Sequence, residues 1–457
     1  MPGGLEFLRA RFAAWAEADA LIVGDDRCTY GRLLDKIDLR LAAMDAARLP
    51  AGAVVILNGD FTVPGVAALL ALIDHGAVAA PVTPSASARL SSFASVADAE
   101  WLVDTDHTET GADPMEPLRR LAGTGDHPLY ARLRAEGHPG LVLFSSGTTG
   151  DPKGVVHDVH RLLLKFQEPR HDLRTIAFLH FDHIGGIDTL FYCLSNGSTV
   201  VVPEDRSPDA VCAAVEKHRV QVLPAAPSFL NLLLLSGAAT RYDLTSLQVV
   251  TYGAELMPDS LLARCMEALP WVRFLQRYGT TEIGTPRSSS PDPGSLWMRL
   301  GGDGVETRVV DGMLEIHTES TMLGYLNAPS PFTEDGWFRT GDTVEVDGDY
   351  IRVLGRATDI ISVGGEKVHP GEVEDVIRRL PNVADVSVFG ESHVLLGQIV
   401  SARVQLITDE DAKSVTERVR SACRERLERY KVPVRVTATT APLTTARLKA
   451  DRRPGSA

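Results

Sequence analysis

The chain has 457 residues, of which 44% are hydrophobic and 23% are charged, and its formal net charge at pH 7 is −14. These proportions are close to those of globular proteins, so they exclude a disordered, collagen-like or coiled-coil chain. The acidic balance, without a long run of Lys or Arg, argues against a nucleic-acid-binding role.

No apolar run reaches the roughly 18 residues that a membrane-spanning helix needs, and the first residues do not form a basic segment followed by an apolar one. The cysteines are scattered and form no CxxC pair, which argues against a disulfide framework or a zinc site. We therefore expect a cytoplasmic protein with no membrane or nucleic-acid partner.

Helical and strand patterns alternate along the first 300 residues or so. Apolar residues at helical spacing predict a helix over 29–46, with Thr29 as its N-cap, and the run at 53–59 predicts a buried strand. The segment 65–82 predicts an apolar helix that ends near Gly76, followed by a short strand. Further strands are predicted at 141–146, 198–203 and 220–226, and a helix at 208–218. This alternation predicts a layered α/β domain with a largely parallel sheet.

The pattern changes after about residue 300, where two segments alternate apolar and polar residues around Asp-Gly pairs, as antiparallel hairpins do. A helix at 371–380, strands at 383–391 and 397–407, and a charged helix at 415–430 are predicted next. We therefore expect two domains: a large N-terminal α/β domain with a β-rich end at 1–356, and a small C-terminal α+β domain at 357–457.

The loop SSGTTGDPKG at 145–154 follows a predicted strand. Small and hydroxylated residues let the backbone approach a phosphate closely, with N–H and O–H donors converging on it. It is not a Walker loop, because Pro152 stands directly before Lys153 where that pattern needs Gly. The predicted phosphate-binding residues are Ser145, Ser146, Gly147, Thr148, Thr149, Gly150 and Lys153.

This loop resembles the phosphate-loop signature of the acyl-adenylate-forming superfamily, which comprises acyl- and aryl-CoA ligases, peptide-synthetase adenylation domains and luciferases. Other motifs of that superfamily follow in the family's order: YGAEL at 252–256, YGTTE at 278–282, DGWFRTGD at 335–342, GRATDIISVGGEKVHPGEVE at 355–374 and YKVP at 430–433. The chain is identified as a member, closest to the CoA ligases. The resemblance implies a C-terminal domain that moves between two half-reactions.

The implied reaction joins a carboxylate to the α-phosphate of ATP, releases pyrophosphate, and then transfers the acyl group to a thiol. Both reactants of the first step are anions, so the site must provide positioned cations and donors. The resemblance gives Lys449 the role of catalytic lysine, supported by Lys153. It places Thr281 at the α-phosphate and makes Glu282 the ligand of Mg²⁺.

The rest of the ATP site is also implied by the resemblance. The backbone at Gly253, Ala254 and Glu255 and the ring of Tyr278 would bracket the adenine, with Gly279 and Thr280 beside them. Asp342 would accept hydrogen bonds from both ribose hydroxyls, which suits a carboxylate. Arg356 would also reach the ribose.

The sequence departs from the family pattern in two places. The segment before Lys449 has Leu448 where the family has Gly, and Leu443 where it has Pro. The hinge position between the domains, usually Asp or Lys, is Thr358. The loop at 362–367 nevertheless resembles that of the CoA ligases, in which small residues leave room for pantetheine.

The segment HFDHIGGIDTLF at 180–191 occupies the family's substrate motif. His183 fits the position beside the acyl carboxylate. Ile184 stands where peptide-synthetase domains carry the Asp that binds an α-amino group, which disfavours a simple α-amino acid. Asp188 is predicted to face the pocket, which favours a polar or cationic group on the substrate. Other predicted substrate-binding residues are Ser228, Tyr252 and Gly284.

The sequence thus predicts an acyl- or aryl-CoA ligase that uses ATP, Mg²⁺, CoA and a small carboxylic acid. One alternative is an adenylating enzyme that loads a carrier protein or another nucleophile. A second alternative is a non-catalytic ligand-binding relative, which Thr358 and Leu448 favour. The intact Lys153, Glu282 and Asp342 argue against that second alternative.

Overall fold

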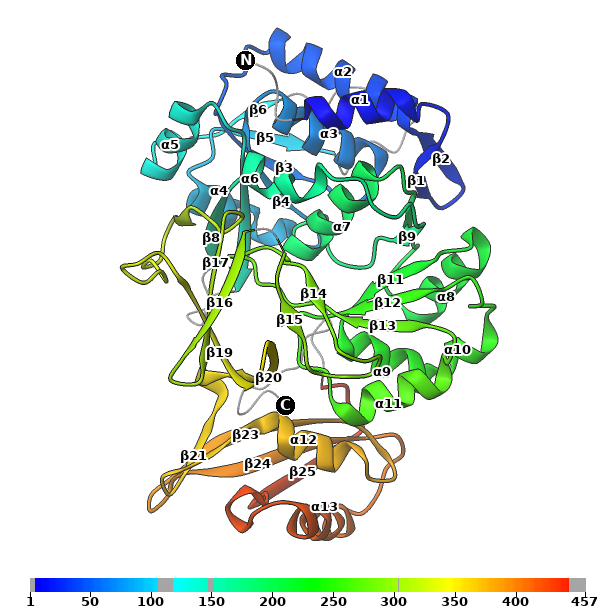
Figure 1. Cartoon of the computed structure of the whole chain (residues 1–457), viewed down its shortest axis with the longest axis vertical. Helices are drawn as coiled ribbons and strands as arrows, with labels where there is room; N and C mark the ends of the chain where they lie inside the picture. The colour runs from blue at the N-terminus through cyan, green and yellow to red at the C-terminus, as the bar shows by residue number, and fades with distance from the viewer. Residues whose placement is uncertain (1–4, 106–117, 147–151, 303, 444–457) are drawn as a thin grey trace.

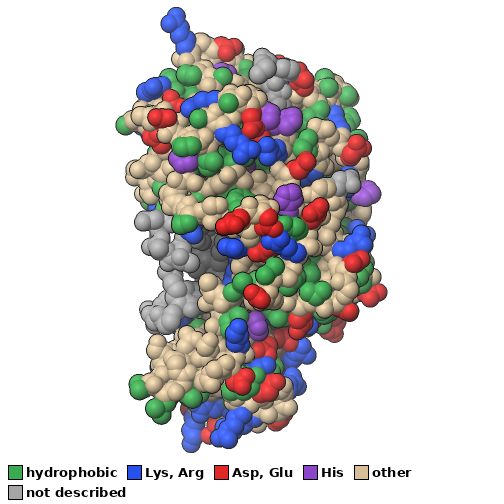
Figure 2. Space-filling model, turned by 60° about the vertical axis from the view of Figure 1, so that its left-hand side comes forward, with side chains coloured by type: hydrophobic (Ala, Val, Ile, Leu, Met, Phe, Trp, Pro, Cys, Tyr) green, Lys and Arg blue, Asp and Glu red, His purple; other side chains and the backbone are tan. Residues whose placement is uncertain are grey.

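The structure is a computed structural model that describes residues 5–105, 118–146, 152–302 and 304–443. Two α/β layers and a β-rich layer form the large upper part of the molecule, and a small α+β unit lies below it (Figure 1). Acidic and basic side chains are interspersed over most of the face that Figure 2 shows. None of the described helices is both long and apolar enough to cross a bilayer.

The first α/β sheet contains the two strands that flank the predicted phosphate loop. In spatial order its strands are β18 (Gly324–Tyr325), β8 (Pro152–Asp158), β7 (Gly140–Ser146), β4 (Val78–Val82), β3 (Val54–Asn58), β5 (Trp101–Asp104) and β6 (Arg119–Arg120). The associated helices are α1 (Glu6–Ala14), α2 (Tyr30–Ala46), α3 (Val63–Asp74), α4 (Leu90–Ala97), α5 (Pro128–Glu136) and α6 (Val159–Leu163). Short 3₁₀ turns lie at Pro84–Arg89 and Leu164–Phe166.

Local sequence explains the helices of this layer. The hydroxyl of Thr29 accepts a hydrogen bond from the backbone N–H of Arg32, which confirms it as the N-cap of α2. Helix α3 is apolar on all sides and almost entirely buried, as expected of a helix enclosed by a core.

The second α/β sheet holds the parallel strands after which the adenine motifs occur. Its order is β13 (Arg273–Gln276), β12 (Val249–Tyr252), β11 (Val222–Ala225), β9 (Thr175–Ile176), β10 (Val200–Val202), β1 (Asp19–Val23) and β2 (Asp26–Thr29). Its helices are α7 (Ile184–Ser195), α8 (Pro208–His218), α9 (Pro227–Ser236), α10 (Ala238–Arg241) and α11 (Asp259–Ala268). Apart from the pair β1–β2, the neighbouring strands run parallel, so the predicted fold class is confirmed for this layer.

The β-rich end of the large part is antiparallel. One sheet has the order β16 (Val305–Val310), β17 (Met313–Thr318), β19 (Phe338–Asp347) and β20 (Tyr350–Arg356), and β14 (Ser288–Ser289) pairs with β15 (Arg299–Leu300). Asp311 and Gly312 join β16 to β17, and both have positive φ, 51° and 76°. This is the two-residue turn that an Asp-Gly pair predicts.

The C-terminal unit has a core of its own, formed where two helices pack on a sheet that is antiparallel except for β25, which runs parallel to β24. Its strands are β21 (Ile361–Val363), β22 (Glu366–Val368), β23 (Val383–His393), β24 (Gly397–Leu406) and β25 (Arg435–Thr439), and its helices are α12 (Pro370–Arg378) and α13 (Ala412–Arg426). Single 3₁₀ turns lie at Ala357–Asp359 and Arg429–Lys431. The predicted domain boundary after residue 356 falls between β20 and the first of these turns, and it stays a prediction.

Candidate active site

The adenine motifs lie together at the carboxyl edge of the second sheet. Strands β12 and β13 are parallel and in register, with Tyr252 opposite Gln276, so Gly253 and Arg277 leave the sheet side by side. A Cβ on Gly253 would lie 2.4 Å from the carbonyl oxygen of Arg277, which only glycine avoids. In open α/β sheets this edge is where ligands bind.

The ring of Tyr278 and the carboxylate of Asp342 form the buried floor of this region. The Tyr278 hydroxyl donates a hydrogen bond to Oδ2 of Asp342 at 2.5 Å. Both residues are largely buried, with exposed fractions of 8% and 6%. Burial, followed by the carboxylate beside it, raises the pKa of Tyr278 well above its usual value. The tyrosine therefore remains a neutral donor toward Asp342.

The register of the antiparallel sheet brings Arg356 to Asp342. The two residues lie opposite each other on β20 and β19, and Nε of Arg356 is 3.0 Å from Oδ1 of Asp342. Burial raises the pKa of Asp342, whereas Arg356 and the Tyr278 hydroxyl lower it, and the net shift is upward. The two predicted ribose residues are thus a charged pair whose arginine side chain remains half exposed.

The strand residues that flank the predicted phosphate loop lie near the predicted magnesium ligand. Lys153 opposes Ser145 on the hairpin of β7 and β8, and Ser146 opposes Pro152. The ammonium of Lys153 lies 5.5 Å from the centre of the Tyr325 ring. The Tyr325 hydroxyl donates to Oε1 of Glu282 at 2.8 Å. Tyr325 therefore bridges the base of the loop and the acidic residue.

His157 holds the YGTTE segment against the first sheet. Its Nε2 lies 2.7 Å from the carbonyl oxygen of Thr281, and the side chain is buried on β8. Burial is the main reason that its pKa falls to about 4. A neutral imidazole can donate from one nitrogen, so the contact with Thr281 is a hydrogen bond from a neutral ring.

Residues 280–284, which contain Thr281 and Glu282, form a tight turn. The backbone N–H of Gly284 donates to the carbonyl oxygen of Thr280 at 3.1 Å, and Gly284 has a φ of +71° that favours glycine. A Cβ on Gly279 would lie 2.6 Å from the carbonyl oxygen of Gly284. The turn thus fixes the backbone on both sides of Thr281 and Glu282.

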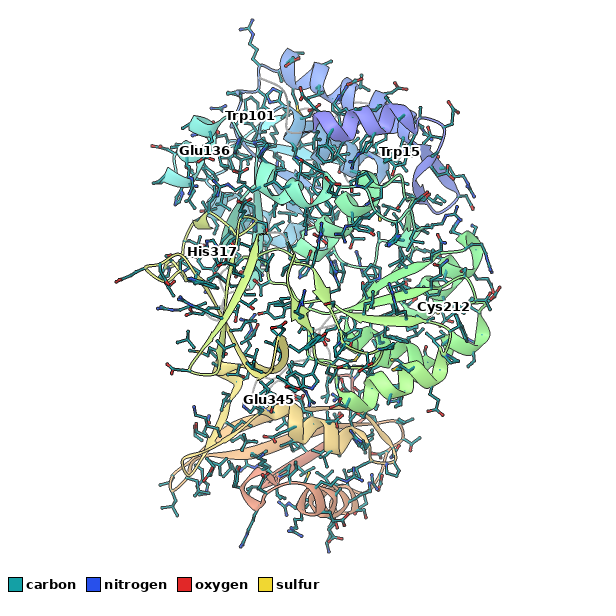
Figure 3. All side chains as sticks on the ribbon, viewed as in Figure 1. Trp15, Trp101, Glu136, Cys212, His317 and Glu345 are labelled. Atoms are coloured by element: carbon teal, nitrogen blue, oxygen red, sulfur yellow. The ribbon has the colours of Figure 1, made fainter. Side chains whose placement is uncertain are left out.

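The adenine motifs and the group of Tyr278, Asp342 and Arg356 border a cavity of about 950 Å³ between the large part and the C-terminal unit. From the large part, Ala254, Tyr278, Asp342 and Arg356 line it. From the C-terminal unit, the lining side chains include Lys367, His369, Glu372 and Lys431. Glu345, another lining residue, lies between the two parts in Figure 3.

The predicted substrate motif forms the beginning of α7. His183 is the N-cap of this helix, and its Nδ1 accepts a hydrogen bond from the N–H of Gly185 at 3.0 Å. Ile184 is buried at the first helical position. The carboxylate of Asp188 pairs with the ammonium of Lys165. A protein cation therefore satisfies Asp188, so this carboxylate alone no longer favours a cationic substrate.

Two other predicted substrate residues lie on β12 and α9. Tyr252 is buried in the hydrophobic core of the second layer. Ser228 lines the cavity beside Glu255. The backbone N–H of Ser228 donates a hydrogen bond to Oε2 of Glu255 at 3.1 Å. Five predicted residues lie outside the described part of the chain: Gly147, Thr148, Thr149, Gly150 and Lys449.

Comparison with known families decides the assignment. The sequence profile of AMP-binding enzymes matches residues 8–326, and the profile of their C-terminal domain matches residues 372–447. The first match alone covers more than half of the chain. The chain belongs to the AMP-binding enzyme family. It is an AMP-forming acid–thiol ligase of the acyl-adenylate-forming superfamily, as its motifs predict.

This AMP-binding enzyme is 28% identical to the long-chain-fatty-acid–CoA ligase FadD13 of Mycobacterium tuberculosis, over 86% of this chain and 80% of that protein. Its fold is similar to that of the anthranilate CoA ligase AuaEII in complex with anthranoyl-AMP, with a TM-score of 0.82, 21% identity, and coverage of 98% of this chain and 95% of that chain. The amide bond synthetase McbA from Marinactinospora thermotolerans is also similar, with a TM-score of 0.79, 25% identity and 98% coverage of each chain. These likenesses confirm the predicted fold class.

Three side chains of this AMP-binding enzyme belong to the site although the motifs did not indicate them. His157 and Tyr325 contact the YGTTE segment from β8 and β18. Lys165 contacts the substrate helix from a 3₁₀ turn. His157 and Lys165 have no local sequence signature, but a buried His is uncommon enough to have marked His157 once burial was known.

Proposed function

We propose that this enzyme forms an acyl-adenylate in the cavity between its two parts and then transfers the acyl group to the thiol of CoA. The observation that carries the proposal is the composition of the cavity wall. Tyr278, Asp342 and Arg356 supply an aromatic face and a charged pair suited to a nucleoside, and both basic and acidic side chains of the C-terminal unit line the same cavity.

The predicted ATP-site residues of the large part, together with Lys449 of the C-terminal unit, act in the first half-reaction. Asp342 and Arg356 bind the ribose hydroxyls, and the ring of Tyr278 packs on the adenine. Lys153 and the loop at 145–150 hold the β- and γ-phosphates, while Thr281 donates to the α-phosphate. Lys449 approaches the reacting carboxylate and the α-phosphate, where one positioned charge stabilises the negative charge of the transition state.

Glu282 fits the role of magnesium ligand. Its carboxylate is partly exposed, and only Oε1 is engaged by Tyr325 among the described side chains. Carboxylate oxygens are hard ligands of the kind that Mg²⁺ prefers. A bound Mg²⁺ would neutralise phosphate charge as the carboxylate of the acid approaches.

The second half-reaction requires the C-terminal unit to turn. Contacts among the described residues that hold it include the amide of Asn231, which donates to the carbonyl oxygen of Ala384 at 2.8 Å, and the hydroxyl of Ser260, which donates to Asp375 at 2.6 Å. Thr358 lies in the 3₁₀ turn between the parts. A hinge residue needs only to tolerate a change of φ and ψ, so Thr358 is compatible with the movement.

A panel of carboxylic acids with ATP and Mg²⁺ tests the proposal by pyrophosphate release. Acid-dependent release, followed by a thioester when CoA is added, is the expected result. Glu282→Gln should raise the Mg²⁺ concentration needed for half-maximal rate. Arg273→Gln, an exposed change on β13 away from the phosphates, is the matched control. No release with any acid would refute the proposal.

One comparison favours an amine, in place of the thiol of CoA, as the acceptor of the acyl group. The amide bond synthetase McbA shares the fold of this chain over its whole length, and Thr358 departs from the usual hinge residue. An amine as the final nucleophile is therefore the alternative to CoA. Mass spectrometry of reactions that contain CoA, an amine or both identifies the acceptor.

A further inference from the structure

A group of charged side chains lies between α7 and the segment that follows β13. The ammonium of Lys165 donates to Asp188 of α7 and, at 3.1 Å each, to the carbonyl oxygen and the hydroxyl of Thr285. The pair is accessible, because 26% of the Lys165 side chain and 17% of the Asp188 side chain are exposed. Lys165 thus links the substrate helix to the segment after the YGTTE motif.

Two guanidinium groups lie near this pair. Arg277 follows β13, and Arg287 stands two residues after Thr285. Burial lowers the pKa of Lys165, Asp188 raises it, and the positive charges of Arg277 and Arg287 add to the lowering. Arg277 also acts on Tyr192 of α7, where it opposes the rise in the pKa of that tyrosine that burial causes. Arg277 therefore acts on this face of α7, and both guanidiniums act on Lys165.

Neither guanidinium has an acceptor among the residues that the structure describes. Within the described ranges, no hydrogen bond or ion pair engages the side chain of Arg277 or Arg287, and both residues are half-buried. Lys165 is the cation that contacts Asp188, and Arg277 and Arg287 add positive charge near Lys165. A partly desolvated excess of positive charge is unfavourable unless an anion joins it.

The position of the group relates it to the acyl pocket. Ile184, Asp188 and Tyr192 are spaced by four residues, so they share one face of α7. Asp188 lies about 7.5 Å along the helix axis from His183, given a rise of about 1.5 Å per residue. His183 is the predicted neighbour of the reacting carboxylate, so the cations lie where the distal end of a short chain or one aromatic ring would be. Arg277 also lines the cavity of the site.

We infer that the acid substrate carries a second anionic group, a carboxylate or a sulfonate, which Arg277 binds with Arg287 beside it. The planar guanidinium matches such groups with two parallel hydrogen bonds. Lys165, held by Asp188 and Thr285, orients the pocket and adds charge. This inference rests on the proposed acid activation and specifies the class of acid.

Matched pairs of acids test it. Each pair shares a carbon frame and differs only at the distal end, which is a carboxylate or sulfonate in one member and a neutral amide in the other. Pyrophosphate release gives kcat/KM for each member. We expect the dianionic member to be preferred by about 10- to 100-fold, the range for hydrogen bonds to charged groups.

Substitutions at Arg277 test whether this residue causes the preference for the dianionic acid. Arg277→Gln should reduce the ratio of the two kcat/KM values about tenfold or more, and Arg277→Glu should shift the preference to a partner with a distal amine. Arg273→Gln, on the exposed side of the preceding strand, should leave the ratio unchanged. Thermal unfolding of each variant shows that it is folded, and the amine-accepting variant provides a gain that misfolding cannot produce.

Two failures are distinguishable. Equal kcat/KM for the two members of every pair, or an unchanged ratio in Arg277→Gln, would overturn the inference while leaving acid activation intact. Absence of pyrophosphate release with all acids would instead refute the proposed function.

Discussion

The hydroxyl of Tyr278 lies 2.5 Å from Oδ2 of Asp342, although 64 residues separate them in the chain. The tyrosine leaves the second α/β sheet and the aspartate belongs to the antiparallel sheet. The contact therefore joins two layers at the point where we place the nucleoside of ATP. A change on either side of it should affect nucleotide binding.

Asp342→Ala should weaken ATP binding by about 10- to 100-fold, because a carboxylate that accepts two ribose hydrogen bonds is lost. The fold should persist, since Arg356 is half exposed and can be hydrated. Tyr278→Phe is the matched control: it loses the hydroxyl but keeps the ring, so its affinity should fall less. Titration calorimetry with ATP measures both. If Asp342→Ala binds ATP with wild-type affinity, another residue binds the ribose.

Lys449→Ala should lower acyl-adenylate formation by roughly two or more orders of magnitude, since one positioned charge in such a site contributes about 3–4 kcal/mol. Thioester formation from pre-made acyl-adenylate should fall much less, because the C-terminal unit has turned by then. Lys413→Ala, on the exposed start of α13, is the matched control. Equal loss in the two half-reactions would contradict the assignment of Lys449.

The motifs predicted the parts of this site that lie within one stretch of chain. The α/β alternation, the Thr29 N-cap and the Asp311-Gly312 turn depend on neighbours in sequence, and all are confirmed. The pairing of Asp342 with Arg356 could also have been predicted from the sequence, because the register of one hairpin sets it.

The residues that were missed depend on packing between distant segments. His157 meets Thr281 across 124 residues, and Lys165 meets Thr285 across 120. No periodicity or spacing indicates such a contact. For the same reason the sequence could not show whether the protein or the substrate satisfies Asp188; the fold gives it the ammonium of Lys165, so this carboxylate alone does not favour a cationic substrate.

The buried His157 should make stability depend on pH. Its pKa is about 4 in the folded protein and about 6.5 in an unfolded chain. Between these values the unfolded state binds the proton and the folded state does not, so stability falls as the pH decreases. The contribution lost between pH 7.5 and pH 5 is about 2 kcal/mol.

Denaturant unfolding of wild type and His157→Gln at the two pH values measures this contribution. The glutamine variant should be less stable at pH 7.5, yet its stability should decrease less on acidification. His317→Gln, a change at an exposed histidine on β17, should retain the wild-type pH dependence. The same decrease in the His157→Gln variant as in wild type would show that other groups cause the acid lability.

The contact between Ser260 and Asp375 provides a test of domain movement. The backbone N–H and the hydroxyl of Ser260, on α11, both donate to Oδ1 of Asp375, at 3.1 and 2.6 Å. Burial raises the pKa of Asp375, but its hydrogen bonds with Ser260 and Arg379 outweigh burial and lower it. The carboxylate is therefore ionised at neutral pH, and the contact helps to hold the C-terminal unit in the arrangement of Figure 1.

Ser260→Ala removes the hydroxyl and should weaken this arrangement by about 1–2 kcal/mol, which corresponds to a roughly tenfold shift in population. If acyl-adenylate forms in this arrangement, its rate should fall while thioester formation from pre-made adenylate is unchanged or faster. Ser414→Ala is the matched control, because Ser414 makes the same paired contact with Asp411 inside the C-terminal unit alone. Single-turnover measurement of each half-reaction separates the outcomes. A loss confined to the thioester step would place this arrangement in the second half-reaction instead.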